Sequence, residues 1–175
     1  MTNPITRLTR RALPLLLVLA TAAPAVAQRA VFVVRHAERA DGGASSMMAA
    51  SDPPLSSAGA ARAERLAALL AGAGVTHAYA TEYTRTIATV EPLARRLGLS
   101  IQQVPAKDTA ALVARLRASG PDDMVVVAGH SNTVPDILKA LGVAEPVTIE
   151  DDEYDNLFIV VPRGEGPPTL LRLRY

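Results

Sequence analysis

The sequence predicts a layered α/β fold whose central sheet is mainly parallel, and three observations support this prediction. Short apolar runs bounded by polar turns are typical of buried parallel strands. Segments in which apolar residues recur at helical spacing alternate with these runs. Two further apolar segments close the sequence and are expected to pair antiparallel. Regular alternation of strands and helices is the pattern of a sheet that is covered by helices.

The expected strands differ in the strength of their signal. The runs "AVFVV" (30–34) and "MVVVAG" (124–129) are uninterrupted and apolar, as strands buried on both faces are. The segments "THAYAT" (76–81) and "IQQV" (101–104) are weaker. The last two strands, "NLFIVV" (156–161) and "TLLRLR" (169–174), form the expected antiparallel pair.

Four helices are expected between these strands. The first has Ser56 or Ser57 as its N-cap and stops at Gly72 or Gly74. The second lies in "EYTRTIATVEPLARRLG", where Pro92 must either kink the helix or begin another one. The third and fourth lie in "DTAALVARLRASG" and "VPDILKALG". The apolar stripe of the second helix is predicted to consist of Ile87, Val90, Ala94 and Leu97.

The first 27 residues are expected to be a secretory signal peptide rather than part of the fold. Three arginines precede a short apolar stretch that ends in Ala25-Val26-Ala27, a small-residue cleavage pattern. Residues 28–175 then form a single domain, located in the periplasm or secreted. An uncleaved membrane anchor is the alternative. The paired arginines leave open whether export follows the general or the twin-arginine route. The sequence has no cysteine, so disulfides and thiol chemistry are excluded.

Composition narrows the possible partners. The formal net charge is +1 and aromatic residues make up 3% of the sequence, so neither a basic tract nor stacking platforms for nucleic acid are present. Two segments, 41–54 and 150–156, fit no strand or helix. The first is long enough to suggest a lid, and the second is acidic. Both are also compatible with ordinary solvated loops.

Polar side chains follow three of the expected strands. Arg35 and His36 end the first, Arg85 lies one turn into the helix after the second, and His130 and Asn132 follow "VVVAG". Ligands of open α/β sheets bind at the carboxyl ends of the strands, so these side chains are expected to meet there. Two guanidiniums match phosphate oxygens, and a neutral imidazole could attack phosphorus. Asn132 could bind the phosphate or cap the following helix.

These residues occur in motifs that resemble a known family. "VVRHAE", "LSSAGAARAERLAALL", "YATEYTRTIATVEPLA" and "VVVAGHSN" are similar, in order and spacing, to the histidine phosphatase (phosphoglycerate mutase-like) superfamily. The resemblance implies a three-layer α/β/α sandwich with a mixed sheet and a phosphatase that needs no cofactor or metal. It also implies that His36 accepts the phosphoryl group and that Arg35, Arg85 and His130 form the phosphate pocket.

The sequence leaves the proton donor open. Mutase-like members of the family carry a glutamate between the helix of the second arginine and the second histidine, but residues 101–123 contain none. Asp108 is the only acid in a suitable register, and it serves equally well as a helix N-cap. Glu38 is the competing candidate. The third possibility is that neither acid is the proton donor. Arg39 could contact the substrate, although a solvated position is favoured for it, and Arg62 is interpreted as solvent-facing.

Other functions remain as alternatives to hydrolysis of phosphomonoesters. The same pocket could belong to a non-catalytic module that binds phosphorylated ligands, to a phosphohistidine-protein phosphatase or to a phosphomutase. A serine hydrolase with Ser131 as nucleophile is disfavoured because no histidine follows that serine. The expected ligand is a small-molecule phosphate ester or a phosphorylated envelope component. The sequence selects neither one of them nor an oligomeric state.

Overall fold

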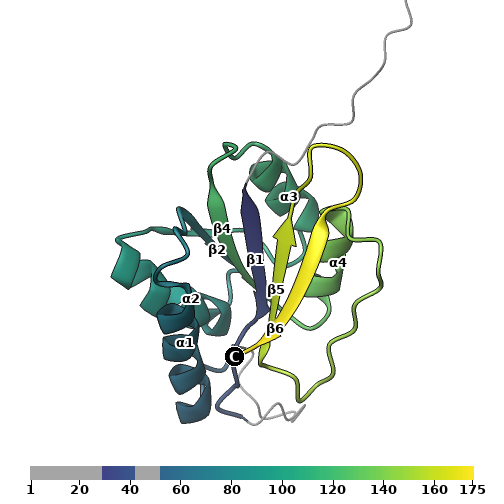
Figure 1. Cartoon of the computed structure of the whole chain (residues 1–175). Helices are drawn as coiled ribbons and strands as arrows, with labels where there is room; N and C mark the ends of the chain where they lie inside the picture. The colour runs from purple at the N-terminus through teal and green to yellow at the C-terminus, as the bar shows by residue number, and fades with distance from the viewer. Residues whose placement is uncertain (1–28, 42–51) are drawn as a thin grey trace, which may run out of the picture.

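The computed structural model describes residues 29–41 and 52–175, which form a mixed sheet of six strands flanked by four helices (Figure 1). The strand order in the sheet is β3-β2-β4-β1-β5-β6. The strands are β1 (Ala30–Arg35), β2 (His77–Ala80), β3 (Ile101–Gln103), β4 (Met124–Gly129), β5 (Asn156–Val161) and β6 (Thr169–Arg174).

The register of the parallel strands brings three of their carboxyl ends to one edge of the sheet. Strands β3, β2, β4 and β1 run parallel, while β5 pairs antiparallel with both β1 and β6. Arg35 lies opposite Gly129, and Ala80 lies opposite Ala128. The chain therefore leaves β1, β2 and β4 at almost the same level, and the residues that follow share one crevice.

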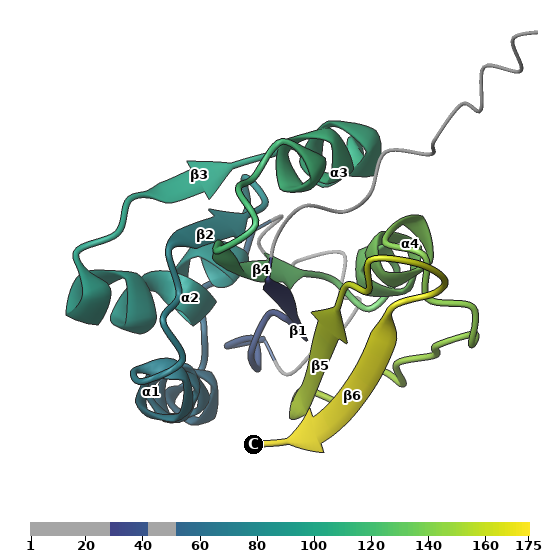
Figure 2. The same ribbon diagram turned by 45° about the horizontal axis from the view of Figure 1, so that its top comes forward.

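Helices cover both faces of the sheet, as Figure 2 shows. Helices α1 (Ser57–Leu70) and α2 (Thr84–Leu97) pack on one face, and α3 (Thr109–Arg117) and α4 (Thr133–Ala140) pack on the other. Strand β1 is buried along its whole length because alternate side chains enter the two cores. Val31 and Val33 face α3 and α4, whereas Phe32 and Val34 face α1 and α2.

The fold confirms the predicted α/β class, its three layers and its mixed sheet, and it corrects one helix. Residues 84–97 form a single helix that continues through Pro92, so the proline does not begin another helix. The apolar stripe predicted for this helix packs against the core, but it is incomplete. Thr86 and Thr89 are fully buried, whereas Ile87 and Leu97 are only half-buried. The two threonines take core positions because their hydroxyl groups serve the site described below.

Two predictions fall on residues outside the described part of the chain. The signal peptide (1–27) lies wholly outside it, and so do residues 42–51 of the expected lid. The two ends of that segment lie side by side, since the Ala40 N–H donates to the Pro54 carbonyl over 2.9 Å. Among the described residues, no helix is both long enough and apolar enough to span a bilayer.

Candidate active site

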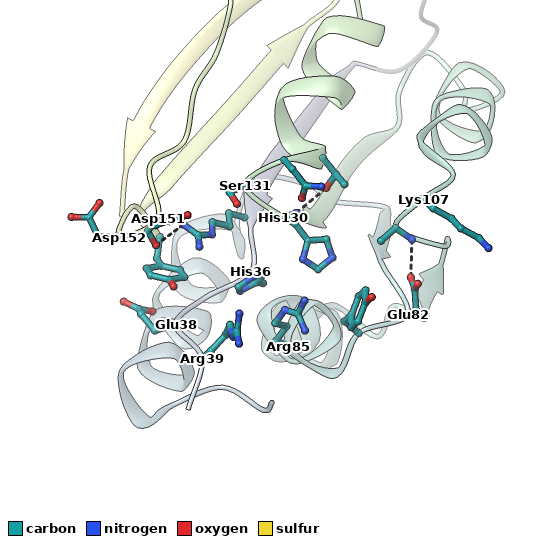
Figure 3. Close-up of a pocket in the computed structure, with 16 residues that line it drawn as sticks. His36, Glu38, Arg39, Glu82, Arg85, Lys107, His130, Ser131, Asp151 and Asp152 are labelled. Atoms are coloured by element: carbon teal, nitrogen blue, oxygen red, sulfur yellow. Dashed lines mark hydrogen bonds between the residues drawn. The ribbon is translucent and has the colours of Figure 1, made fainter. Parts of the chain in front are cut away.

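A pocket of about 910 Å³ opens at the carboxyl ends of β1, β2 and β4 (Figure 3). It contains most of the side chains that the sequence predicts to meet there. His36, Arg85 and His130 surround one space in the figure. The predicted residues that line it are Arg35, His36, Glu38, Arg85, His130 and Asn132, and Asp108 is not among them.

The His36 ring is buried, neutral and fixed in one tautomer. Its Nδ1 lies 2.8 Å from the Ala37 carbonyl oxygen, which can only accept a hydrogen bond, so Nδ1 carries the proton. The lone pair of a neutral ring is then on Nε2. Burial lowers the pKa of His36 to about 3, and nearby positive charges act in the same direction. An uncharged ring with a free Nε2 can act as a nucleophile at neutral pH.

Helix α2 fixes the backbone on which His36 stands. The Ala37 N–H donates to Thr89 Oγ1 over 2.9 Å, and the Thr89 hydroxyl donates to the Arg85 carbonyl over 2.7 Å. Thr89 has no exposed surface. Both backbone groups of Ala37 are thus engaged, one by Thr89 and the other by the His36 ring. This arrangement explains why a threonine occupies a position that helical spacing assigns to the core.

Arg35 is anchored through one nitrogen and leaves the opposite edge of its guanidinium open. Its Nη1 donates to the carbonyls of Glu150, Asp151 and Glu153 over 2.8, 3.0 and 3.1 Å. Its Nε is buried and has no hydrogen-bond partner in the described part of the chain. The Nε and Nη2 edge of a guanidinium is the one that binds a tetrahedral oxyanion with two parallel hydrogen bonds. A buried donor without a partner is costly, so this edge is suited to a ligand.

Arg85 repeats this arrangement on the other side of His36. Its Nη1 donates to Asp52 Oδ1 over 3.2 Å, while its Nε is also buried and has no partner within residues 29–41 and 52–175. Asp52 Oδ2 accepts from the backbone N–H and the hydroxyl of Thr84, so Asp52 also caps α2. Burial alone raises the pKa of Asp52, but the hydrogen bonds from Thr84 and the charge of Arg85 outweigh it and lower the value.

The second imidazole, His130, is held by a chain of hydroxyl groups. Its Nε2 lies 3.0 Å from Thr81 Oγ1, which lies 2.8 Å from Thr86 Oγ1. The Thr86 hydroxyl has the Tyr83 carbonyl as an acceptor at 2.7 Å. Burial lowers the pKa of His130 to about 4, and the charge of Arg85 adds to this effect. The His36 and His130 rings meet edge to face, with centroids 5.3 Å apart.

Asn132 begins α4 but does not cap it. Its side chain makes no capping hydrogen bond, is exposed and lines the pocket, so it is available to a ligand. The neighbouring Thr133 holds the turn instead, because its Oγ1 accepts from the His130 N–H over 2.9 Å. A Cβ on Gly129 would lie only 2.9 Å from that oxygen, which explains the glycine in the motif.

The two acids that the sequence offered as proton donors are both engaged elsewhere. Glu38 receives three hydrogen bonds from Arg62, at 2.6 to 2.9 Å. Burial alone would raise the pKa of Glu38, but Arg62 outweighs it and lowers the value, so the carboxylate stays ionised. Asp108 Oδ1 accepts from the Ala111 N–H over 2.9 Å, which is the geometry of the helix-cap alternative.

The sequence analysis missed several side chains of the pocket. Arg39 lines it, and its buried Nε has no hydrogen-bond partner among the described residues, so its position fits the substrate-contact alternative and not the solvated one. Arg62 is also largely covered, since it pairs with Glu38. Glu82 follows directly on Thr81 in the strand-end motif, which is the signal that could have identified it. The aromatic residues of the pocket are Tyr83 and Tyr154.

Among residues 29–41 and 52–175, no three His, Cys, Asp or Glu side chains form a group that could hold a metal ion.

Fold and pocket together define an α/β protein that presents paired imidazoles and guanidiniums at the carboxyl ends of parallel strands. The sequence model of the histidine phosphatase superfamily (branch 1) matches residues 31–108, a range that contains Arg35, His36 and Arg85. The resemblance to this superfamily that the motifs indicate is therefore confirmed over this part of the chain. No curated protein is significantly similar to it in sequence.

Two solved structures illustrate the shared fold. The protein histidine phosphatase SixA complexed with tungstate is 20% identical, with a TM-score of 0.67, and the match covers 83% of this chain and 96% of SixA. The mycobacterial glucosyl-3-phosphoglycerate phosphatase is 16% identical, with a TM-score of 0.64, and the match covers 84% of this chain and 98% of that protein. At these identities the likeness shows a shared fold.

Proposed function

We propose that this protein is a phosphatase that hydrolyses phosphomonoesters through a phosphohistidine intermediate on His36, without a metal ion. One observation carries the proposal. A buried, neutral imidazole with its lone pair on Nε2 lies in a pocket with two guanidiniums, and the Nε of each guanidinium has no partner among the residues that the structure describes. Open donors beside a nucleophile match the charge and shape of a phosphate ester.

The reaction follows from these groups. The ester phosphate binds to the open edges of Arg35 and Arg85, and Asn132 is free to donate to a further oxygen. His36 Nε2 attacks phosphorus while the bond to the ester oxygen breaks, and the leaving oxygen takes a proton from an acid. Water then attacks the phosphohistidine, the P–N bond breaks, and inorganic phosphate leaves. His130 can donate to a non-bridging oxygen once the bound anion raises its pKa.

Glu82 is the acid that we assign to the leaving group. It lines the pocket and lies close enough to His130 to raise the pKa of that ring. One of its oxygens, Oε2, accepts from the Ala106 N–H over 2.7 Å, which orients the carboxyl group. Unlike Glu38, it has no arginine partner among the described residues.

The two solved relatives support phosphate chemistry without selecting a substrate. Tungstate, bound in the SixA structure, is a tetrahedral oxyanion like phosphate, and the mycobacterial phosphatase has also been solved with inorganic phosphate. Their names specify different substrates, one a phosphorylated histidine in a protein and the other a sugar-acid phosphate. For this chain the proposed substrate is a small-molecule phosphate ester or a phosphorylated envelope component. The signal-like residues 1–27 support a periplasmic or secreted location.

The central test is turnover of p-nitrophenyl phosphate in excess EDTA. We expect the wild-type protein to be active and to accumulate an acid-labile phosphoprotein on rapid quenching. His36→Ala should lose both properties, with activity reduced by about 10⁴-fold or more. His77→Ala is the matched control, because His77 lies at the opposite end of β2 beside Thr76. Full activity of His36→Ala would refute the mechanism.

A phosphate-binding module is the second candidate, and one observation favours it. Both acids that the sequence offered as donors are engaged, Glu38 by Arg62 and Asp108 by its own helix. Complete inactivity on a broad panel of phosphate esters, together with tight tungstate binding that Arg35→Ala abolishes, would establish this function. Conversion between phosphorylated isomers without net hydrolysis would indicate a phosphomutase.

A further inference from the structure

The turn that holds Arg35 is braced in both directions by a single acidic residue. In this turn, residues 150–153, the Glu153 N–H donates to the Glu150 carbonyl over 3.0 Å. The Glu150 N–H donates in return to Glu153 Oε2, also over 3.0 Å. The backbone and the side chain of Glu153 therefore both close the turn. Its three carbonyls can converge on Arg35 Nη1 only while the turn is closed.

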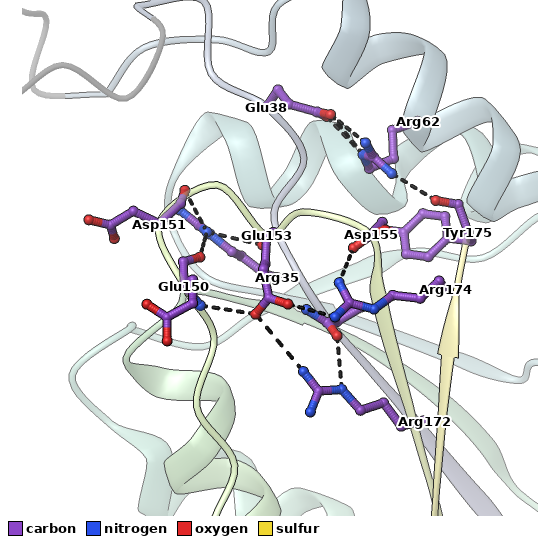
Figure 4. Close-up of polar contacts among 11 residues, drawn as sticks. Arg35, Glu38, Arg62, Glu150, Asp151, Glu153, Asp155, Arg172, Arg174 and Tyr175 are labelled. Carbon is purple, nitrogen blue, oxygen red and sulfur yellow. Dashed lines mark hydrogen bonds and ion pairs between the residues drawn. The ribbon is translucent and has the colours of Figure 1, made fainter.

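The second carboxylate oxygen of Glu153 ties this turn to the sheet. Oε1 accepts from Arg174 Nη2 over 2.6 Å, and Arg174 also pairs with Asp155 (Figure 4). The hydrogen bond from Arg174 is the main reason why the pKa of Glu153 is lowered, and the Glu150 N–H adds to it. The Glu153 carboxylate is therefore ionised at neutral pH. Strand β6 thus supports a residue at the end of β1.

The residue after the turn completes the arrangement around Arg35. The Tyr154 ring lies 4.1 Å from the guanidinium carbon of Arg35, a distance typical of a cation–π contact. Its centroid is also 6.1 Å from that of His36. The turn and Tyr154 together hold the guanidinium on one edge and one face. A shift of the turn would displace both contacts, and with them the open edge that faces the ligand.

We propose that Glu153 is a positioning residue for the phosphate pocket. It does not line the pocket, and it acts by closing the turn whose carbonyls orient Arg35 beside His36. The proposal rests on the proposed function only for its kinetic consequence. A guanidinium that is fixed in advance binds the transition state without first being ordered, so loss of the brace weakens catalysis.

The test compares two acids of the same turn. Glu153→Ala removes the brace, whereas Glu150→Ala removes an equal charge and leaves every backbone contact of the turn in place. Among the described residues the Glu150 carboxylate has no partner, and it does not line the pocket. We expect Glu153→Ala to lower kcat/KM for p-nitrophenyl phosphate by about 10- to 100-fold. Glu150→Ala should stay within about twofold of the wild type.

Stability and coupling separate positioning from general damage. Exposed ion pairs contribute little to folding, so we expect the melting temperature of Glu153→Ala to fall by no more than about 4 °C. In an Arg35→Ala background the Glu153→Ala change should have no further effect on kcat/KM, since both act through one guanidinium. Equal additional losses in the two backgrounds would overturn the proposal. Glu153→Gln, which keeps one accepting oxygen, should recover part of the activity.

Two readouts remain valid if the protein turns over no ester. The first is the affinity for tungstate, which should fall in Glu153→Ala and not in Glu150→Ala. The second is the Arg35 Nε–H resonance in a nitrogen-15 spectrum, which should be sharp in the wild type and in Glu150→Ala and exchange-broadened in Glu153→Ala. An unchanged Arg35 signal in Glu153→Ala would overturn the positioning role, whatever the activity of the wild type.

Discussion

The two guanidiniums of the pocket are held in chemically different ways. Arg35, at the end of β1, is anchored by three neutral carbonyls from a turn that lies more than 100 residues later in the sequence. Arg85, in α2, is anchored by the carboxylate of Asp52. A carbonyl fixes the geometry of a guanidinium and leaves its charge uncompensated, whereas a carboxylate also offsets the charge. Among the described residues, a carboxylate thus pairs with Arg85 and none with Arg35.

The largest expected effect follows from this difference in charge. We expect Arg35→Ala to lower kcat/KM for p-nitrophenyl phosphate by about 10³-fold and Arg85→Ala by about 10²-fold. Steady-state kinetics at fixed ionic strength would measure both values. In an Asp52→Asn background no carboxylate offsets the charge of Arg85. Arg85→Ala should then lower kcat/KM more, and the difference between the two losses should narrow. A larger loss in Arg85→Ala than in Arg35→Ala would contradict the comparison.

The next effect concerns the acid on the Arg85 side of the pocket. If Glu82 protonates the leaving group, Glu82→Gln should slow hydrolysis of an alkyl phosphate by about 10²-fold and of an aryl phosphate much less. An alkoxide is a poor leaving group and needs the proton more than a phenolate does. Asp108→Asn is the matched control, since Asp108 caps α3 and does not line the pocket. Equal small losses on both substrates would remove Glu82 from the mechanism.

The two imidazoles should make the stability of the protein depend on pH. Their pKa values are lowered to about 3 for His36 and about 4 for His130. An unfolded chain protonates its histidines near pH 6.5, so it binds more protons than the folded chain below that pH. Stability should therefore fall as the pH decreases from 6.5 to 4, by up to about 1.4 kcal/mol per pH unit for each ring.

Urea unfolding of histidine variants would test this dependence. Replacing either His36 or His130 by Asn should remove the contribution of that ring to the slope of the unfolding free energy against pH. A slope that both variants share with the wild type would show that the rings become protonated without unfolding.

The smallest effects concern two threonines of α2. Thr89 contacts the backbone next to His36, and Thr86 belongs to the hydroxyl chain that holds His130. Thr89→Val would leave the buried N–H of Ala37 without an acceptor, at a cost of about 1–3 kcal/mol. Thr86→Val should cost about 1 kcal/mol, because the Thr81 hydroxyl that loses its partner can rotate toward another acceptor, whereas a backbone N–H cannot. Chemical denaturation would rank the two variants. The reverse order would indicate that the hydroxyl chain to His130 is the more tightly fixed of the two.

Local patterns predicted most of the fold and the four main residues of the pocket. Apolar runs mark β1 and β4 because those strands are buried on both faces, and side chains that follow them must emerge at one edge. Arg35, His36, Arg85 and His130 could therefore be identified from sequence position alone. The predicted apolar stripe of α2 was incomplete because Thr86 and Thr89 are buried to satisfy polar groups of the site, which hydrophobic periodicity does not register.

The supports of the pocket could not be predicted for a different reason. Asp52 and Glu153 act through contacts with residues that are distant in the sequence or on another strand, and no periodic pattern marks such pairs. The same limit applies to Glu38. Its ion pair with Arg62 depends on how closely α1 packs against the backbone of Glu38. A Cβ on Gly59 would lie 2.3 Å from the Glu38 carbonyl oxygen, so this glycine is needed for that approach.

The long-range anchoring of Arg35 has a consequence for how the protein folds. A chain in which only the segment from β1 to the turn after β4 is ordered already contains the two histidines and the two arginines of the phosphate pocket. It lacks the carbonyls that orient Arg35. Contacts that close such long loops are costly in entropy and tend to form late. Oxyanion affinity should consequently be the last native property to appear during refolding. In hydrogen exchange, a bound anion should slow the openings that release β5 and β6 as much as it slows global unfolding.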